Sequence, residues 1–253
     1  ESVQFGFAIW RRFHDWMGLP EKFKQVRFSG RIIIDPKRDK PPFWVYNAPS
    51  KQLFMSTYHM NDTNLASYVE KLNEFQPDLI DGYPSAIFIL SQFIVKNNSK
   101  LAFSPKAIAT TAETLYVHQR ETIQEAFKCK VYDQYASSEG APFIAQCEYS
   151  NYHMNFDTGI FEFIDTKDFV REMIITSFRA LKVPLIRYRI GDFVELMRVG
   201  AECSCGREFP LIKAILGRDD DILYTDEKGF VGRMDPAYKD LQGIVSSQIV
   251  QRT

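Results

Sequence analysis

The spacing of apolar residues predicts that helices and strands alternate through the first half of the chain. Residues 1–18 carry apolar side chains at helical spacing, and Gly18 ends that segment. Further helices are predicted after the capping candidates at 61–63, from Pro84 onward and over 115–127, and strands over 32–34, 78–80, 107–111 and 130–132. This alternation is typical of an α/β domain with a largely parallel sheet.

After about Phe143 the pattern changes to strands alone, which predicts an antiparallel, β-rich section. The strands expected there are residues 160–164, 173–177, 185–189 and 193–197. A last piece begins near Arg218, and residues 226–229 are typical of a hairpin turn. We therefore predict a large domain over 1–217, incomplete at its N-terminus, and over 218–253 a hinge with the incomplete start of a small C-terminal domain.

Composition and charge narrow the class of protein. The chain has 253 residues, of which 45% are hydrophobic and 25% charged, and its net charge of -1 favours neither nucleic acid nor an anionic membrane as a partner. Its most apolar run, residues 86–95, is shorter than the roughly 20 residues that a membrane-spanning helix needs. A cytoplasmic protein without a membrane span is expected. The missing initiator Met and the abrupt end suggest that both ends have been cut, and nothing indicates an oligomeric state.

Three polar clusters follow predicted strands, where α/β sheets bind their ligands. They are residues 110–113, 133–140 and 187–192. A tyrosine ring such as that of Tyr135 can stack on a base, and a carboxylate such as that of Glu139 is a natural Mg²⁺ ligand. Taken singly, each cluster could equally be an ordinary turn, and Glu139 could cap a helix.

The order of these clusters resembles that of the motifs in the adenylate-forming superfamily, above all in its phenylacetate–CoA ligase-like branch, which includes capsular polysaccharide biosynthesis proteins. The resemblance covers nearly the whole chain, and Ala136 stands where the family usually has Gly. The matching segments are residues 82–85 (Gly-Tyr-Pro-Ser), 111–115 (Thr-Ala-Glu-Thr-Leu), 135–139 (Tyr-Ala-Ser-Ser-Glu), 184–192 (Pro-Leu-Ile-Arg-Tyr-Arg-Ile-Gly-Asp) and 217–221 (Gly-Arg-Asp-Asp-Asp).

The resemblance implies a nucleotide site in the large domain. Its residues would be Ala112 and Glu113 at the adenine, Asp133, Gln134 and Tyr135 along the base, Ser138 at phosphate, Asp192 at the ribose and Arg218 near ribose or phosphate. Glu139 would hold Mg²⁺ and, with Arg218, act in catalysis, and Asp220 would be the hinge between domains. Tyr83 and Ser85 would lie near the acyl substrate. His59 would border the same pocket, with a hydrogen-bonded structural histidine as the alternative.

The implied activity is an ATP-dependent ligase that makes an acyl- or aryl-adenylate from a small carboxylic acid and passes it to coenzyme A. One alternative transfers the acyl group to an amine or hydroxyl in cell-surface polysaccharide biosynthesis. Another is an inactive, zinc-stabilised binding protein. The family's Gly/Ser/Thr-rich phosphate loop is missing upstream, and its catalytic Lys would lie beyond Thr253, so we expect a truncated chain rather than a lost reaction.

Cysteine and histidine residues predict a second, structural site. Three thiolates and one imidazole, from Cys147, His153, Cys203 and Cys205, can form a closed tetrahedral zinc site. The C-x-C spacing is tighter than usual for zinc, but some members of the resembling branch bind zinc through a similar set. The alternative is three buried free thiols. Cys129 is expected to be an inert buried thiol.

Overall fold

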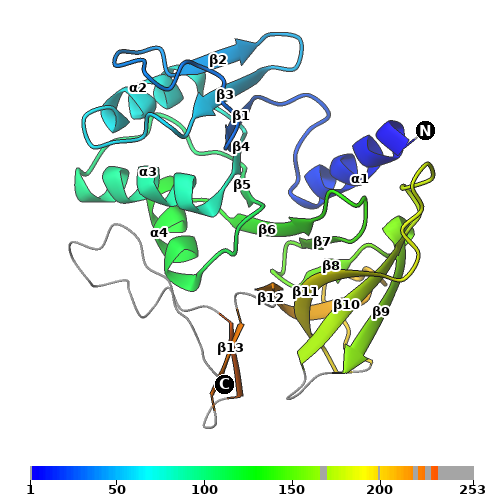
Figure 1. The fold of residues 1–253 in the computed structure, drawn as a ribbon. Helices are drawn as coiled ribbons and strands as arrows, with labels where there is room; N and C mark the ends of the chain where they lie inside the picture. Colours follow the sequence, from blue (N-terminus) through cyan, green and yellow to red (C-terminus); the bar gives the residue numbers. More distant parts are fainter. Residues whose placement is uncertain (1, 166–169, 199, 219–221, 226–228, 233–253) are drawn as a thin grey trace.

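The described part of the chain folds around one long mixed sheet. The computed structural model describes residues 2–165, 170–198, 200–218, 222–225 and 229–232 (Figure 1). Its helices are α1 (Ser2–Trp16), α2 (Leu65–Phe75), α3 (Pro84–Lys96), α4 (Val117–Phe127) and the short 3₁₀ helix η1 (Phe156–Thr158). None of the helices in these ranges is long and apolar enough to cross a membrane.

The strands fall into a parallel and an antiparallel half. The first seven are β1 (Gln25–Ser29), β2 (Trp44–Asn47), β3 (Gln52–Ser56), β4 (Leu79–Gly82), β5 (Ala107–Thr110), β6 (Val131–Ala136) and β7 (Phe143–Gln146). The others are β8 (Tyr152–Met154), β9 (Gly159–Asp165), β10 (Val170–Ser177), β11 (Tyr188–Leu196), β12 (Leu211–Arg218), β13 (Ile222–Thr225) and β14 (Gly229–Gly232). Twelve of them form a sheet in the order β2-β3-β1-β4-β5-β6-β7-β8-β12-β11-β10-β9, and β13 pairs with β14 separately. In this order, neighbouring strands from β3 to β6 run parallel. Neighbouring strands from β6 to β9, at the far edge of the sheet, run antiparallel.

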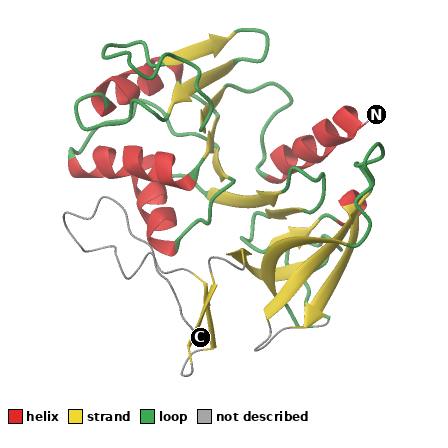
Figure 2. Ribbon diagram, in the orientation of Figure 1, coloured by secondary structure: helices red, strands yellow, loops and turns green. Residues whose placement is uncertain are grey.

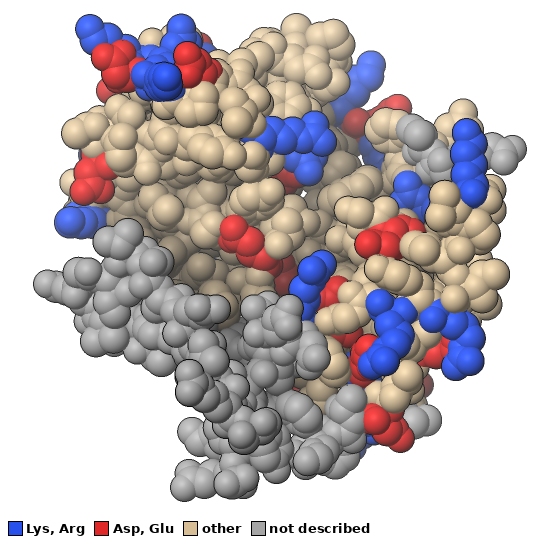
Figure 3. All heavy atoms as spheres, in the orientation of Figure 1, with Lys and Arg blue, Asp and Glu red and all other residues tan. Residues whose placement is uncertain are grey.

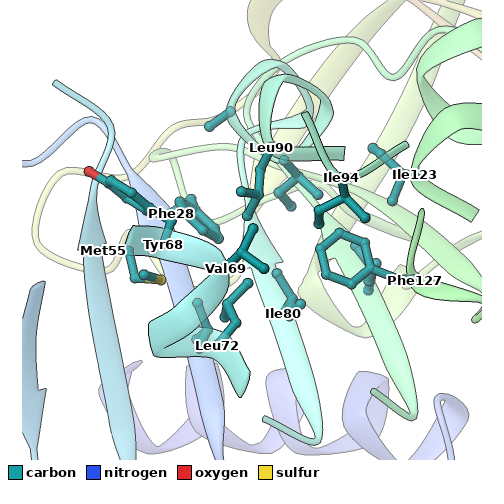
Figure 4. Close-up of a cluster of buried hydrophobic side chains, with 14 of the residues drawn as sticks. Phe28, Met55, Tyr68, Val69, Leu72, Ile80, Leu90, Ile94, Ile123 and Phe127 are labelled. Carbon is teal, nitrogen blue, oxygen red and sulfur yellow. The ribbon is translucent and has the colours of Figure 1, made fainter. Parts of the chain in front are cut away.

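Helices cover the two faces of the parallel half. Helices α2, α3 and α4 lie together on one face and α1 on the other, while the strand-only half extends away from them (Figures 1 and 2). The larger hydrophobic core lies under α2 and α3, where Tyr68, Leu72 and Leu90 are fully buried against Phe28 and Ile80 (Figure 4). Ile9, Phe13 and Trp16 of α1 pack on the opposite face. The α/β class with a β-rich section is therefore confirmed.

Several predicted boundaries were wrong. Residues 32–34 form a loop rather than a strand, and Ile32 is 65% exposed there because no neighbouring strand pairs with it. The strands predicted at 185–189 and 193–197 form one strand, β11, which begins only at Tyr188. Strand β12 continues the large sheet as far as Arg218, the first residue of the predicted second domain. That second domain stays a prediction.

A buried carboxylate, Asp81, lies in β4 at the centre of the parallel strands. Its side chain is 6% exposed, and its partner is the guanidinium of Arg27 on β1, whose Nε lies 3.6 Å from Oδ2. The other carboxylate oxygen is buried without a hydrogen bond. Burial raises the pKa of Asp81 to about 6, although Arg27 and a hydrogen bond from Gln25 lower it.

This raised pKa predicts that Asp81 destabilises the folded chain at neutral pH. Between the unfolded value of 3.8 and about 6, the folded state holds the proton more tightly, so the contribution of Asp81 to the free energy of unfolding falls as pH rises. We expect Asp81→Asn to raise the free energy of unfolding by about 1–3 kcal/mol at pH 8, and by less at pH 5. Urea denaturation at both pH values measures this. The control is Asp62→Asn, which removes an exposed carboxylate, and an equal gain at both pH values would contradict the prediction.

Candidate functional site

A cavity of about 400 Å³ opens at the carboxyl ends of β5 and β6, where β11 and β12 close it from the antiparallel half. All residues of the predicted nucleotide and Mg²⁺ site line it: Ala112, Glu113, Asp133, Gln134, Tyr135, Ser138, Glu139, Asp192 and Arg218. They come from four separate stretches of the chain, at residues 112–113, 133–139, 192 and 218. The structure therefore brings together in one place the residues that the sequence motifs singled out, while their roles stay predictions.

Asp133 forms the floor of this cavity. Its carboxylate is buried, and it accepts hydrogen bonds from the hydroxyls of Thr110 at 2.6 Å and Tyr152 at 2.5 Å. Burial raises the pKa of Asp133, and the two hydroxyl donors oppose that rise because they stabilise the charged form. The side-chain amide of Gln134 next to it donates to the hydroxyl of Thr111. These bonds fix an acceptor group at the end of β6.

Tyr135 joins the two halves of the sheet across the cavity. Its hydroxyl donates to Oδ2 of Asp192 on β11 at 2.5 Å, and Oδ1 of Asp192 lies 3.8 Å from Nε of Arg218 on β12. Burial, and next the hydrogen bond to Asp192, raise the pKa of Tyr135. The ring is therefore held as a neutral phenol, with its orientation set by a carboxylate from another strand.

The loop after β5 is held by helix α3, which precedes β5 in the chain. The carboxylate of Glu113 accepts two hydrogen bonds of 3.0 Å from Ser85, one from the backbone N–H and one from the hydroxyl. Ser85 lies in the first turn of α3, where a negative charge also meets the positive end of the helix dipole. These two hydrogen bonds hold the loop in place. The loop is strained, since Ala112 beside Glu113 has a φ of 68°. Ser85, predicted near the acyl substrate, is thus bonded to a predicted adenine residue.

The turn from β4 into α3 depends on a glycine. Gly82 has a φ of 150°, and a Cβ there would lie 2.0 Å from the carbonyl oxygen of Phe28. A larger residue would displace the strand, so glycine alone fits this close approach. By contrast, Ala136 ends β6 as an extended residue paired with Phe143, which explains why alanine is accommodated where the family usually has glycine.

Ser138 and Glu139 lie at the mouth of the cavity and also line a second hollow of about 320 Å³. The remaining lining of that hollow comes from Gly140 and from Arg179, Ala180, Val183 and Leu185 of the loop between β10 and β11. The carboxylate of Glu139 is of the type that binds Mg²⁺, and the half-exposed position leaves room for the water ligands that Mg²⁺ retains.

None of the three predicted substrate residues, His59, Tyr83 and Ser85, is among the residues that line this cavity. His59 is buried, its Nδ1 is 2.7 Å from the hydroxyl of Ser56, its Nε2 is 3.1 Å from the carbonyl of Asp35, and its ring stacks on Phe43. These are the contacts of a structural histidine, and substrate contact by His59 stays a prediction. Tyr83 packs against the larger core. Asp220, the predicted hinge, lies outside the described residues.

The predicted zinc ligands also come together. One ligand atom from each of Cys147, His153, Cys203 and Cys205 lies within 4.8 Å of the others. Two of the contacts are 3.3 Å between Sγ of Cys205 and Nε2 of His153, and 3.6 Å between Sγ of Cys147 and Sγ of Cys203. Four soft donors at these separations fit a tetrahedral Zn²⁺, whose ligands are about 3.3–3.9 Å apart.

Backbone and amide donors surround the sulfur atoms. The N–H of Tyr149 donates to Sγ of Cys147 at 3.3 Å, and the side-chain amide of Asn151 donates to Sγ of Cys203 at 3.2 Å. Nδ1 of His153 lies 3.3 Å from the carbonyl of Phe209, which leaves Nε2 facing the thiols. Such outer contacts orient the ligands of a metal site. Cys129 belongs instead to the larger core, and burial raises the pKa of its thiol to about 12.

Sequence reasoning missed several residues of the nucleotide-type cavity. Tyr152, Ile190 and Ile215 line it. Gln146 supports it indirectly, because its Oε1 accepts a hydrogen bond from the backbone N–H of Asp133. Ile190 falls inside a motif that was recognised, so its place could have been inferred. Tyr152 and Gln146 belong to short strands that carried no periodicity signal, and only the pairing of β7 with β8 brings them here.

Charged side chains of the strand-only half pair with one another around the site. Glu162 and Arg187 lie 3.1 Å apart and Glu172 and Arg189 2.6 Å apart, across β9, β10 and β11. Figure 3 shows acidic and basic side chains side by side on this part of the molecule, whereas the surface over α3 is mostly uncharged. The two arginines of the motif at 184–192 are therefore engaged in ion pairs with neighbouring strands.

Comparisons with known proteins agree on the fold. No family model matches the chain. Protein CapK of Staphylococcus aureus is 40% identical over 242 residues, which is 94% of this chain and 54% of CapK. The structure of 2-hydroxyisobutyryl-CoA ligase in complex with R3-HIB-AMP matches with a TM-score of 0.66 and 19% identity, over 92% of this chain and 51% of that one. A benzoate CoA ligase from Burkholderia xenovorans LB400 matches with a TM-score of 0.51 and 15% identity, over 82% of this chain and 44% of that one.

The chain thus spans about half the length of the proteins that it matches. Both of these solved neighbours are CoA ligases, and the first is in the postadenylation state in complex with R3-HIB-AMP. The chain therefore has the fold of the adenylate-forming CoA ligases and is related in sequence to CapK over most of its length.

Proposed function

We propose that the protein carrying this chain is an adenylate-forming ligase, which activates a small carboxylic acid with ATP and passes the acyl group to coenzyme A. The observation that carries this proposal is the convergence of the predicted adenine, ribose and Mg²⁺ residues on one cavity at the carboxyl ends of β5 and β6. The AMP conjugate held by the solved neighbour supports it. Because the chain spans about half of its relatives, the proposal concerns the full-length protein.

The residues of the cavity suit separate parts of a nucleotide. The buried carboxylate of Asp133 is an acceptor for the exocyclic amine of adenine, and the ring of Tyr135 is a stacking surface for the base. The carboxylate of Asp192, held by Tyr135, would accept hydrogen bonds from the ribose hydroxyls. Arg218 would place a positive charge beside the phosphates. These groups bind and orient ATP for attack by the substrate carboxylate.

That attack brings one anion against another, so charge must be neutralised at the phosphates. Glu139 would hold Mg²⁺, which when bound withdraws negative charge from the phosphate oxygens. Donors fixed before the reaction begins stabilise the transferring group without further rearrangement. The walls formed by Leu115, Ile190 and Ile215 would exclude water from the base end of the site.

A second candidate function differs only in the acyl acceptor. The chain is 40% identical to CapK but 19% identical to 2-hydroxyisobutyryl-CoA ligase. Its sequence is therefore more similar to CapK, and the name of CapK specifies no reaction with coenzyme A. The resemblance to capsular polysaccharide proteins favours an amine or hydroxyl of a cell-surface saccharide as the alternative acceptor. An ATP-consuming enzyme with reduced thiols is in either case suited to the cytoplasm.

Pyrophosphate release by the full-length protein tests the proposal. With ATP, Mg²⁺ and a panel of aliphatic and aromatic acids, we expect release with at least one acid and thioester formation when coenzyme A is added. Glu139→Gln should lower kcat about 100-fold through loss of the metal ligand. Asp192→Asn should raise KM for ATP about tenfold, because a charged hydrogen-bond acceptor is lost. Glu125→Gln, which changes an exposed residue of α4, is the matched control.

The outcomes separate the candidates. Adenylation that needs no coenzyme A, with product formed only on a sugar amine or hydroxyl, would favour the second candidate. Failure of the full-length protein to consume ATP with any acid would leave the inactive binding protein as the remaining hypothesis.

We also propose that Cys147, His153, Cys203 and Cys205 hold one structural zinc ion. Two ligand pairs at 3.3 and 3.6 Å, and four protein ligands that would fill a tetrahedral shell, support a structural role. The ion would fasten the loop between β11 and β12 to the β7–β8 hairpin. It would also support α1, because Trp16 packs edge-on against His153 with ring centroids 5.6 Å apart.

Metal analysis of purified variants checks this proposal. We expect about one zinc per wild-type chain by elemental analysis, and loss of most of it in Cys205→Ser, together with a lower melting temperature because metal binding contributes to folding. Cys129→Ser is the matched control, since Cys129 lies in the other core and should leave the zinc content unchanged. Retention of zinc by Cys205→Ser, or loss of zinc from Cys129→Ser, would contradict the assignment.

A further inference from the structure

The β7–β8 hairpin presents two different sites on its two faces. Gln146 and Tyr152 are cross-strand partners, and each directly precedes a residue of the thiol–imidazole cluster, Cys147 and His153. Because successive strand side chains point to opposite faces, the two pairs face in opposite directions. The packing agrees: Cys147 belongs to the hydrophobic cluster under α1, whereas Tyr152 packs in the cluster of the antiparallel half and lines the nucleotide-type cavity.

Tyr152 reaches the floor of that cavity directly. Its hydroxyl donates to Oδ2 of Asp133 at 2.5 Å, and Thr110 donates to the other oxygen at 2.6 Å. A buried carboxylate depends on such donors, because each offsets part of the cost of removing its charge from water. The position of Tyr152 therefore affects both the orientation and the charge of Asp133.

Gln146 connects the same floor to the loop of the cluster. Its Oε1 accepts hydrogen bonds from the N–H of Asp133 at 3.0 Å and from Arg120 at 2.8 Å, and its amide donates to the carbonyl of Ser150 at 3.0 Å. Ser150 lies between the cluster residues and donates its N–H to the carbonyl of Cys147 at 2.9 Å. The side chain of Gln146 is buried and uses both its acceptor and its donor in this bridge.

We propose that Gln146 and Tyr152 are positioning residues, through which a metal bound by Cys147, His153, Cys203 and Cys205 fixes Asp133 in the nucleotide cavity. This inference rests on the proposed nucleotide and zinc sites, and it adds that binding at one strengthens binding at the other. The coupling runs through one short hairpin, whose strands have four and three residues and which contacts both sites.

The physical reason is the geometry of a short hairpin. A metal that holds Cys147 and His153 fixes the ends of the loop, and with it the carbonyl of Ser150 and the register of Gln146 opposite Tyr152. Without the metal, thiols and imidazole lose a common partner, and the two hydrogen-bond partners of Asp133 on the hairpin become free to shift: the hydroxyl of Tyr152, which donates to its carboxylate, and Oε1 of Gln146, which accepts from its N–H. Since coupling free energy is reciprocal, ATP must raise the affinity for the metal by the same factor by which the metal raises the affinity for ATP.

Nucleotide binding by the full-length, zinc-loaded protein tests the first half of the proposal. Isothermal titration calorimetry with Mg²⁺-ATP should show a Kd about five- to tenfold weaker in Tyr152→Phe and in Gln146→Leu, with zinc content unchanged. Tyr149→Phe is the matched control, because Tyr149 lies in the same loop but its side chain is 56% exposed. Calorimetry reads binding alone, so the result does not depend on the acid or the acyl acceptor.

Metal affinity tests the second half. Competition of the zinc-loaded protein with a chromogenic chelator should show metal release about five- to tenfold less favourable in the presence of ATP. In Tyr152→Phe this effect of ATP should shrink or disappear, which a purely structural role of the hydroxyl would not produce. Substitution of Co²⁺ for zinc gives an independent readout, since its absorption bands should change on addition of ATP to the wild type and change less in Tyr152→Phe.

Two results would overturn the inference while leaving the proposed function intact. They are an unchanged Kd for ATP in both variants, and a metal affinity that ATP does not alter in the wild type. If the wild type bound no ATP at all, the proposed function would fail, and this inference with it. If it bound ATP but contained no metal in the cluster, the linkage would be refuted and the nucleotide site retained.

Discussion

The buried carboxylate of Asp133 is the constraint on which both halves of the molecule depend. A charge removed from water is stable only where fixed donors surround it, and Asp133 obtains them from Thr110 on β5 and Tyr152 on β8. Its backbone is held in turn by Gln146 on β7. The parallel half, which supplies the loops of the cavity, and the antiparallel half, which closes it, are thus tied at one residue.

These contacts at Asp133 also explain why the sheet changes from parallel to antiparallel pairing after β6. From β3 to β6 the successive strands run parallel and are separated by helices, so each carboxyl end can present a loop to a ligand. From β7 onward neighbouring strands in the sheet run antiparallel, and the pairing of β11 with β12 places Asp192 beside Arg218 and opposite Tyr135 across the cavity. A purely parallel sheet would leave this side of the cavity open.

Motif order and hydrophobic periodicity predicted the α/β class and most of the cavity residues, because the relevant segments are long or chemically distinctive. Short strands such as β8, with three residues, carry no periodicity, so neither Tyr152 nor Gln146 could be placed from sequence. The three isoleucines at 32–34 predicted a strand on propensity alone, yet a strand needs a neighbour to pair with. The zinc-type cluster joined residues that are more than fifty positions apart, which chemistry could suggest but only the fold brings together.

The charges of the cavity lining limit which ligands the cavity can bind without a cation. Four carboxylates line it, from Glu113, Asp133, Glu139 and Asp192, whereas Arg218 is the one Lys or Arg in the lining that the described residues provide. Acceptors of this kind suit the amine and hydroxyl groups of a nucleoside, but they repel a triphosphate. Binding of ATP there therefore requires a divalent cation and further positive groups at the phosphate end. In the proposed site the described residues would hold the nucleoside half of ATP, and the repulsion at its other end would make Mg²⁺ a condition of binding as well as of catalysis.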